Sequence, residues 1–411
     1  MKTVTELDLP VLDYTDPTLV GARFHEVMKG LREQSWLAAA EPLGYVLLDH
    51  EPVDVLLRTR RARMPALEIL ELQGVTDGPM HDQLSGNLIN LGGDEHRRLR
   101  GLVQAPFLPK AAERLRPAMR RHVAALFDAV AIDGACEFVS TVAKPYPARM
   151  IAEIVGAPVS DAERLGEWAY WIQGVFDPIK VAGRLDRIDQ AAAEFERYVR
   201  DLLARPGDAD GDDLLATLRA ARNAGELSED ACVHLVSSVL VGGVDTTQAQ
   251  LAHAVRLFAE HPSQWATLTA DPTLVPAAVA EVLRFEPIAP FTARLVTDNL
   301  TLRDVVFPAG TVLFACALTA NHDPAVFTDP DVFDITAERG EATPLSFGAG
   351  PHFCLGAALA RAELEEAIGF LAERVARLEL AGAPSYDTPA GVYGLLELPI
   401  RFELAGVAAR S

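Results

Sequence analysis

The chain has 411 residues, of which 49% are hydrophobic and 23% charged, a composition that lets a globular protein bury a large core. Its formal net charge of −21 argues against general nucleic-acid binding, because a phosphate backbone would repel it. The N-terminus, MKTVTELDLP, has no apolar signal core, and the longest apolar helical stretch, about 235–244, is shorter than the roughly 20 residues of a membrane span. We therefore expect no nucleic-acid partner and no membrane segment.

The four cysteines, Cys136, Cys232, Cys316 and Cys354, are scattered, and no two of them form a C-x-x-C pair. A disulfide framework or a cysteine zinc site is therefore not expected, and this usage fits a reducing cytoplasm. Any functional role of a cysteine then belongs to a single residue acting alone.

Most of the first two thirds of the chain has helical patterning, with a turn-rich surface loop at 205–213. Ser160 and Glu163 form a capping-box pattern, which predicts the start of a helix. A very long helix is predicted from Ser228, a favourable N-cap, to His261, which precedes a proline. At about 1.5 Å per residue it would be roughly 50 Å long, enough to cross the molecule.

The last third mixes helices with strands. The predicted elements are a helix at about 276–285, strand-like pieces (TARLV, LTL and TVLFAC) within 288–314, an aperiodic segment rich in Pro and Asp at 321–347, a long helix from about Gly356, and a terminal strand in LLELPIRFEL. No boundary divides the chain, so we expect a mainly α fold. It would form one domain, 1–411, with β-rich parts near the N-terminus, at 288–318 and at 392–404.

Cys354 is the leading candidate for a functional cysteine, because it lies in the glycine-rich stretch FGAGPHFCLG, 347–356. Glycines permit a tight loop and close approach to a flat ligand. The free N–H groups and positive end of the following helix would lower the pKa of the thiol and stabilise a thiolate. A lone thiolate in such a loop is what a haem-thiolate iron requires. For a cysteine taken alone, a buried structural role is the commoner alternative.

This loop resembles, position by position, the cysteine-ligand loop of the cytochrome P450 family. The matching residues are Phe347, Gly348, Gly350, His352, Cys354, Leu355 and Gly356. The loop departs from many bacterial members at Ala349 and Pro351, and neither position bears on the iron ligand. The resemblance extends over residues 10–404. It implies a triangular, mainly helical domain with a small β-rich region and a long central helix. It also implies haem b (iron protoporphyrin IX) bound through Cys354 and contacted by Phe347, Gly348 and Gly356.

Glu281 and Arg284, in the sequence EVLR, are three positions apart on the helix predicted at about 276–285. Across proteins such a pair is most often a solvated ion pair that contributes a few tenths of a kcal/mol. The family has an E-x-x-R pair in this position, inside the protein. The resemblance therefore implies a structural role, in which Glu281 and Arg284 support the loop that leads to the cysteine.

Gly242 and Gly243 lie in the middle of the predicted long helix, followed by Val244, Asp245 and Thr246. Each glycine costs about 1 kcal/mol relative to alanine there, so something should compensate. Close helix packing and room over a cofactor are equally good explanations, and a threonine in mid-helix can loosen the backbone hydrogen bonds. The motif resembles the oxygen-activation groove of the family. The resemblance implies that Thr246 hydrogen-bonds dioxygen or its water and that Asp245 helps to deliver protons.

His96 and Arg100 are four residues apart, so on a helix both side chains point to one face. A solvated charged face is the default interpretation, but two donors on one face can also bind an anion. The family has the same H-x-x-x-R pair here, which implies contacts with a haem propionate. Arg294 and His352 also match family positions that contact the propionates.

The segment from Arg97 to Arg121 contains eight Lys and Arg residues and one acid, Glu113. In a chain with a net charge of −21 this is a local reversal of sign. A solvated helix face and a docking surface for an acidic electron donor explain it equally well. The chain has no flavin or ferredoxin region of its own, so electrons should come from a separate ferredoxin-type partner.

The expected reaction is insertion of one oxygen atom from O₂ into an apolar small molecule, by hydroxylation or epoxidation. A thiolate ligand favours O–O cleavage. Two rivals remain at this stage. A peroxide-driven haem-thiolate enzyme would not need the Asp245–Thr246 pair, and a non-catalytic haem sensor or electron carrier would need neither that pair nor an open pocket.

By family position, the substrate pocket would be lined by mainly apolar residues, namely Leu88, Ile89, Ser238, Val241, Gly242, Ile288, Ala289, Phe291, and Leu395 or Leu396. Some of Trp168, Tyr170, Trp171 and Phe176 could form a lid, although most would serve in core packing. No Lys or Arg occurs at 233–244 or 287–293, so a buried carboxylate beside the iron would lack a cation. We therefore expect a substrate that presents an uncharged, apolar region, and a monomeric enzyme.

Overall fold

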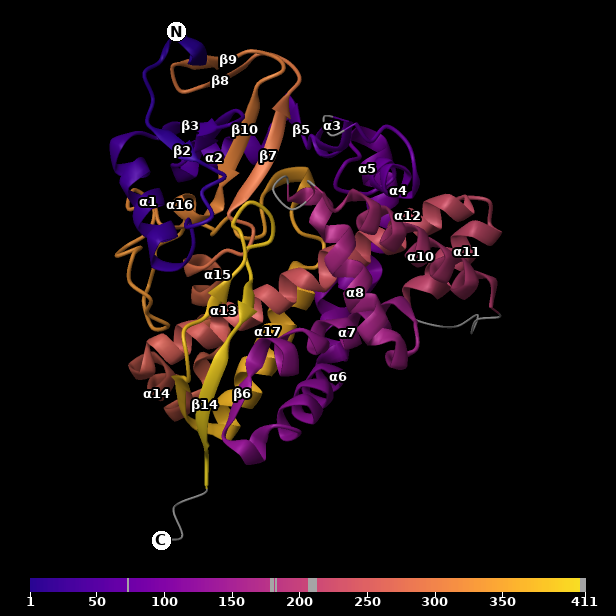
Figure 1. Cartoon of the computed structure of the whole chain (residues 1–411), viewed down its shortest axis with the longest axis vertical. Coiled ribbons are helices and arrows are strands. Elements are labelled where there is room, and N and C mark those ends of the chain that lie inside the picture. The colour runs from indigo at the N-terminus through magenta and orange to yellow at the C-terminus, as the bar shows by residue number, and fades with distance from the viewer. Residues whose placement is uncertain (72–73, 178–180, 182, 206–212, 407–411) are drawn as a thin grey trace.

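The computed structural model describes residues 1–71, 74–177, 181, 183–205 and 213–406 (Figure 1). Most of the predicted surface loop, residues 206–212, lies outside the described residues. The helices are α1 (Gly21–Gln34), α2 (His50–Arg58), α3 (Ala66–Glu71), α4 (Pro79–Ser85), α5 (Gly93–Val103), α6 (Pro109–Asp128), α7 (Pro145–Val155), α8 (Ala162–Gln173), α10 (Leu185–Ala204), α11 (Leu214–Asn223), α12 (Glu229–Gly243), α13 (Asp245–Glu260), α14 (Pro262–Ala270), α15 (Val275–Phe285), α16 (Ala317–Asn321) and α17 (Ala357–Arg374).

The strands are short and concentrated toward the two ends of the chain. They are β1 (Lys2–Thr3), β2 (Val11–Asp13), β3 (Leu37–Glu41), β4 (Tyr45–Leu47), β5 (Ala62–Arg63), β6 (Ala135–Glu137), β7 (Phe291–Val296), β8 (Leu300–Leu302), β9 (Val305–Phe307), β10 (Val312–Cys316), β11 (Val375–Leu380), β12 (Ser385–Tyr386), β13 (Leu395–Glu397) and β14 (Pro399–Leu404). The strands predicted within 288–314 and at the C-terminus, and the helices predicted at 276–285 and after Gly356, are confirmed.

The main sheet joins the N-terminal strands to those of the last third of the chain. Its order is β2-β3-β4-β10-β7-β5, with β4 and β10 parallel and β7 antiparallel to β10. In Figure 1 the indigo and orange strands of this sheet lie beside the helical part, in which α13 and α17 lie near the middle of the view. The sheet thus brings residues near position 40 next to residues near position 300 at the edge of the helical core.

The predicted long helix is correct in its ends and wrong in its continuity. Ser228 caps the N-terminus, because its side chain accepts a hydrogen bond from the backbone N–H of Ala231. The helix is interrupted at Val244, whose φ of −95° and ψ of −71° separate α12 from α13. The hydroxyl of Thr246 donates to the backbone oxygen of Gly242 at 2.7 Å and competes with the regular helical pattern. The adjacent glycines make this distortion easier.

The predicted capping box at Ser160 and Glu163 is wrong. A tight 3₁₀ turn at Val159–Asp161 takes up Ser160, and α8 begins one residue later, with Asp161 at its N-cap. The carboxylate of Asp161 accepts a hydrogen bond from the hydroxyl of Tyr198 on α10. The residue at the N-cap of α8 is thus bonded to a distant helix, which the local pattern could not predict. Within the described ranges, no helix is long and apolar enough to cross a membrane.

Candidate active site

Cys354 lies between a short 3₁₀ turn at Gly350–His352 and the start of α17. Its backbone N–H donates to the oxygen of Phe347 at 2.9 Å, which closes the loop. Gly348 and Gly350 have φ values of 68° and 69°, so both need the left-handed backbone that glycine allows. A Cβ atom on Gly350 would lie 2.8 Å from the backbone oxygen of Leu57 on α2. The loop is therefore held tightly against α2 and leaves the cysteine at its end.

The expected lowering of the pKa of Cys354 is wrong in its net direction. The backbone N–H of Gly356 does lower the pKa of the thiol, as the sequence predicted, and the nearby Arg100 and Arg361 act in the same direction. Burial raises it by more, so the net pKa lies above the ordinary value for a cysteine. The loop alone does not favour a thiolate. A bound metal would, because a coordinating thiol is deprotonated by the charge of the ion.

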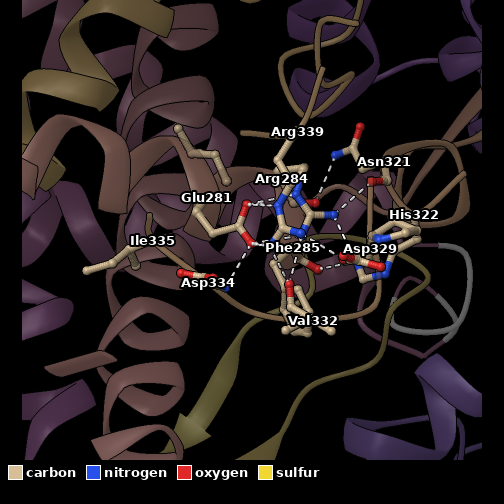
Figure 2. A network of polar contacts seen from close by, with 12 residues as sticks. Glu281, Arg284, Phe285, Asn321, His322, Asp329, Val332, Asp334, Ile335 and Arg339 are labelled. Carbon is tan, nitrogen blue, oxygen red and sulfur yellow. Dashed lines mark hydrogen bonds and ion pairs between the residues drawn. The ribbon is translucent and has the colours of Figure 1, made fainter. Parts of the chain in front are cut away.

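Glu281 and Arg284 lie inside the protein, with 5% and 1% of their surfaces exposed (Figure 2). The guanidinium of Arg284 donates to both carboxylate oxygens of Glu281, at 2.8 and 2.9 Å. It also donates to the backbone oxygens of Asn321 and Pro330, at 3.0 and 2.8 Å. Arg339 forms a second ion pair with the same carboxylate. The pair is thus a buried hub and not the solvated ion pair that is commoner for such spacing.

Asn321 connects the Glu281–Arg284 pair to the cysteine loop, and no motif around Asn321 predicted this role. Its side-chain amide donates to the oxygen of Arg284 at 3.1 Å and to the hydroxyl of Ser346 at 2.9 Å. Its side-chain oxygen accepts from the backbone N–H of Leu345 at 2.7 Å. Leu345 and Ser346 directly precede Phe347, the first residue of the loop. The geometry therefore supports the predicted structural role of Glu281 and Arg284, through one residue that was missed.

The predicted propionate contacts come together from three distant segments. The imidazole rings of His96 on α5 and His352 in the cysteine loop have their centroids 4.4 Å apart. Arg100, one turn after His96, donates to the backbone oxygen of Phe353 at 2.7 Å. Burial, together with the nearby charges of His96, Arg294 and Arg100, lowers the pKa of His352 to about 4. The structure thus gathers cationic and donor groups next to the cysteine.

The burial and the hydrogen bonding of Arg294 show whether this cluster could bind an anionic group. It is 6% exposed, and burial lowers the pKa of its guanidinium to about 10. Among the described residues it bonds to the backbone oxygen of Ala293, and no carboxylate pairs with it. A buried guanidinium without a carboxylate is costly unless an anion is supplied from elsewhere. The haem propionates are such anions, so the residues present fit the cofactor.

The two glycines of α12 differ in what a side chain at each position would contact. A Cβ atom on Gly243 would overlap the side chain of Ile151 on α7, whereas a Cβ atom on Gly242 would meet nothing within 4 Å. Close helix packing, one of the two explanations left open by the sequence, therefore applies to Gly243 and not to Gly242. Gly243 permits close helix packing, and Gly242 leaves open space on the face that also carries Thr246.

Phe291 corrects the predicted set of substrate-lining residues. Its ring packs edge-on against Tyr14 and lies next to Phe24, in a core cluster beside α1. Side chains alternate along a strand, so Phe291 and Arg294 on β7 point to opposite faces of the sheet. A strand that directs Arg294 toward the cysteine loop must direct Phe291 away from it.

The other predicted lining residues are compatible with a common wall. The backbone N–H of Leu88 donates to the hydroxyl of Ser238 on α12 at 3.1 Å, which places the segment 86–92 beside that helix. Val241 and Leu395 are buried, while Ile288 is partly exposed.

Two of the four aromatic residues considered for a lid, Trp168 and Phe176, serve in packing. Trp168 is buried against Phe195 and Tyr198. Phe176 packs at the margin of the same core. Tyr170 and Trp171 instead line a small cavity of about 80 Å³, whose other lining residues include Asp245, Gln248, Leu395 and Leu396.

At least half of the eight basic residues in the stretch 97–121 form ion pairs within the described residues. These are Arg97 with Asp94, Arg116 with Glu113, Glu365 and Glu366, Arg120 with Glu366 and Glu373, and Arg121 with Glu153. Half of these acids come from α17, which packs along α6 and is distant in sequence. This corrects the expected reversal of sign over the whole stretch. Lys110 is exposed and, among the described residues, has no ion-pair partner.

Comparisons with known proteins agree with this architecture. A family model described as cytochrome P450 matches residues 176–374. The chain is 37% identical to luteothin monooxygenase of Streptomyces thioluteus, over 97% of each chain. It is 33% identical to nocardicin C N-oxygenase of Nocardia uniformis subsp. tsuyamanensis, over 97% of this chain and 98% of the relative. The crystal structure of CalO2 has a TM-score of 0.90 at 28% identity, covering 97% of this chain and 100% of that one.

Relatives that span nearly the whole chain are monooxygenases, and the fold is shared with solved structures of the same kind. The protein is therefore a haem-thiolate monooxygenase. It belongs to the cytochrome P450 family, and with the family come a haem cofactor, a substrate, O₂ and a redox partner. The expected fold class, family and enzyme class are confirmed.

Proposed function

We propose that Cys354 is the thiolate ligand of a haem b iron and that the enzyme inserts one oxygen atom from O₂ into an apolar small molecule. The observation that carries the proposal is the position of Cys354. It ends a loop closed by two left-handed glycines and supported through Asn321 by the buried Glu281–Arg284 pair. The cofactor would supply the activation of O₂, and the protein supplies the ligand, the electrostatic field and the pocket.

The residues around Cys354 have separate tasks in holding the cofactor. His96, Arg100, Arg294 and His352 would bind the propionates, with the buried Arg294 contributing the strongest pairing. Phe347, Gly348 and Gly356 would lie along the flat ring, where Gly348 and Gly356 leave open space because a Cβ atom on either would meet nothing within 4 Å.

Thr246 and Asp245 would manage protons. The hydroxyl of Thr246 gives its hydrogen to the backbone oxygen of Gly242, so it presents only lone pairs to the open space beside Gly242. It can therefore hold a water molecule by accepting a hydrogen bond from it. Asp245 lines the small cavity next to this position and can exchange protons with water there. This pairing favours O₂ chemistry over the peroxide-driven alternative, and a non-catalytic haem carrier would have no use for it.

The substrate would present an uncharged, apolar region to the iron. Leu88, Ile89, Val241, Gly242 and Leu395 would form its surroundings, together with Ser238, Ile288 and Ala289. Ser238 contributes little polarity, because its hydroxyl already donates to the oxygen of His234 and accepts from the N–H of Leu88. A ligand-bound structure with a carboxylate in contact above the haem would contradict this assignment. We also propose that the enzyme is a cytoplasmic monomer of one domain.

The thiolate assignment is tested by spectroscopy. The reduced, CO-bound protein is expected to absorb at the thiolate-type Soret position, and Cys354→Ala is expected to lose that band completely, because no other described cysteine lies in the loop. Cys316→Ala, which removes a cysteine buried on β10, is the matched control and should keep the band. A thiolate band retained in Cys354→Ala would show that the assignment is wrong.

An acidic ferredoxin would dock on the side of Phe353, which is exposed, adjacent to Cys354 and bonded through its backbone oxygen to Arg100 of the basic stretch. Lys110 is the exposed cation of that stretch on which we test this. Lys110→Glu is expected to slow haem reduction about tenfold at low salt, because Lys110 has no ion-pair partner among the described residues. Rising ionic strength should remove this difference, since surface charges are screened within about 10 Å at 0.1 M salt. Stopped-flow reduction measures both effects.

Arg377→Glu is the control for this experiment. Arg377 is exposed on β11, beyond the far end of α17, roughly 27 Å of helix away from Cys354. The same change of charge there should leave the reduction rate unaltered. Equal rates for Lys110→Glu and Arg377→Glu would exclude the Arg97–Arg121 side as the docking surface.

A further inference from the structure

A buried glutamine connects three helices next to the proposed substrate site. Gln83 lies on α4, only 1% exposed. Its amide nitrogen donates to the backbone oxygen of Ala192 on α10 at 2.7 Å, and its amide oxygen accepts from the hydroxyl of Ser237 on α12 at 3.0 Å. We call these two hydrogen bonds the Gln83 bridge. A backbone oxygen can only accept, so the bridge permits one orientation of the amide.

The segment that follows α4 is attached to α12 at two further points. The backbone N–H of Leu88 donates to the hydroxyl of Ser238, which is the neighbour of Ser237 in the bridge. Gly86 has a φ of −93°, which any residue can adopt, yet a Cβ atom there would overlap the imidazole ring of His234. Glycine is needed at position 86 for contact with α12 and not for its backbone.

The other end of α4 is attached to α10. The N–H of Met80 donates to the carboxylate of Asp189 at 3.0 Å. The start of α4 is therefore bonded to α10 through Met80. Its middle is bonded to both α10 and α12 through Gln83. The segment just after its end is bonded to α12 through Leu88. Figure 1 shows α4 beside α10 and α12, directly before α5.

These attachments fix a segment that matters for the reaction. Residues 86–92 contain Leu88 and Ile89 and lead directly into the helix that carries His96 and Arg100. Apolar contacts alone would hold α4 with little directional preference. The Gln83 bridge forms only when α4 has one particular position along α10 and α12, because both of its hydrogen bonds need their partners at fixed places. When the segment moves away, water can replace the lost partners, so opening remains possible.

We propose that Gln83 and Ser237 are positioning residues for the monooxygenase reaction, and that the Gln83 bridge sets how the segment 86–92 closes over the substrate site. The proposal rests on the proposed function, because that function places Leu88 and Ile89 at the substrate. The bridge acts through these residues and does not itself touch the substrate.

The first test measures hydrogen exchange in the haem-loaded protein. Ser237→Ala leaves the buried amide oxygen of Gln83 without a donor. Amides in residues 79–92 are expected to exchange about tenfold faster, which corresponds to the roughly 1.4 kcal/mol of one lost buried hydrogen bond. Ser237→Thr keeps the hydroxyl and should restore slow exchange. Tyr146→Phe removes another buried hydroxyl, bonded to the oxygen of Glu363, and should leave 79–92 unchanged.

The second test measures ligand entry with 4-phenylimidazole, an aromatic ligand of haem iron that is followed by absorbance. In Ser237→Ala both its association and its dissociation rates are expected to rise several-fold, because the site opens more often. Wild type, Ser237→Thr and Tyr146→Phe should share the slower rates. A purely structural role would lower the melting temperature of Ser237→Ala without changing these rates.

Two results would overturn the proposal: exchange at 79–92 that is no faster in Ser237→Ala than in Tyr146→Phe, or faster exchange with unchanged 4-phenylimidazole rates. Failure of the proposed function would look different. The CO-bound protein would then lack the thiolate band, while hydrogen exchange at 79–92 would still report on the bridge, since it does not depend on the iron ligand.

Discussion

Arg284→Ala is expected to lower the free energy of unfolding by about 3–5 kcal/mol, because it removes one of the two guanidinium groups that pair with the buried carboxylate of Glu281 and leaves only Arg339 there. The backbone oxygens of Asn321 and Pro330 would lose their donor as well. A typical domain is held folded by roughly 5–15 kcal/mol, so this change would remove a large share of the stability and should lower the fraction of chains that retain haem. Urea unfolding and the haem content per chain measure the effect.

An exposed pair of the same chemistry provides the control. Arg58 and Asp54 on α2 form an i,i+4 ion pair at 2.8 Å, with the arginine side chain 59% exposed. Arg58→Ala should change the unfolding free energy by about 0.5 kcal/mol or less, because solvent screens such pairs. If Arg284→Ala and Arg58→Ala were equally stable, Glu281 and Arg284 could not be the support of the cysteine loop.

Thr246→Ala is expected to keep consuming NADPH and O₂ while the ratio of product formed to NADPH consumed falls by about tenfold or more. The hydroxyl that would hold a proton-carrying water is lost, so reduced oxygen should leave as hydrogen peroxide. Asp245→Asn should instead slow turnover, because it impairs the supply of protons and leaves the hydroxyl in place. Product, NADPH and peroxide are assayed in parallel.

The adjacent threonine separates this role from packing. Thr247 is 4% exposed and points into the core, so Thr247→Ala should lower stability and leave the coupling ratio unchanged. Thr246→Ser, which keeps a hydroxyl, should recover most of the coupling. An unaltered ratio in Thr246→Ala would remove Thr246 and Asp245 from the mechanism, and the assignment of Cys354 would stand.

The features that the sequence predicted well depend on local chemistry. The glycines around Cys354, the cap at Ser228 and the strands near Arg294 all follow from residues close together in the chain. The two glycines of α12 were recognised as unusual, but their separate reasons became visible only with Ile151 in place. Backbone propensity and spacing act over a few residues, and such effects can be predicted without a fold.

The features that were missed join positions far apart in the chain. Gln83 and Ser237 are 154 positions apart, and Arg116 and Glu366 are 250 apart. Neither separation matches a helix or strand period, so the sequence alone does not indicate that these residues are in contact. Phe291 was expected among the substrate-lining residues, whereas its ring packs in the cluster beside α1, because the face to which a strand residue points depends on where the sheet packs. Long-range contacts of this kind require the folded structure.

The unequal glycines of α12 make the two positions unequal targets for redesign. Alanine at position 243 would collide with Ile151, so the helices would have to separate and the cost would fall on the whole core. A Cβ atom at position 242 would meet nothing within 4 Å, so alanine there fits without moving its neighbours. In the proposed substrate site this change would add one methyl group, which makes position 242, and not position 243, the place where the shape of that site can be altered.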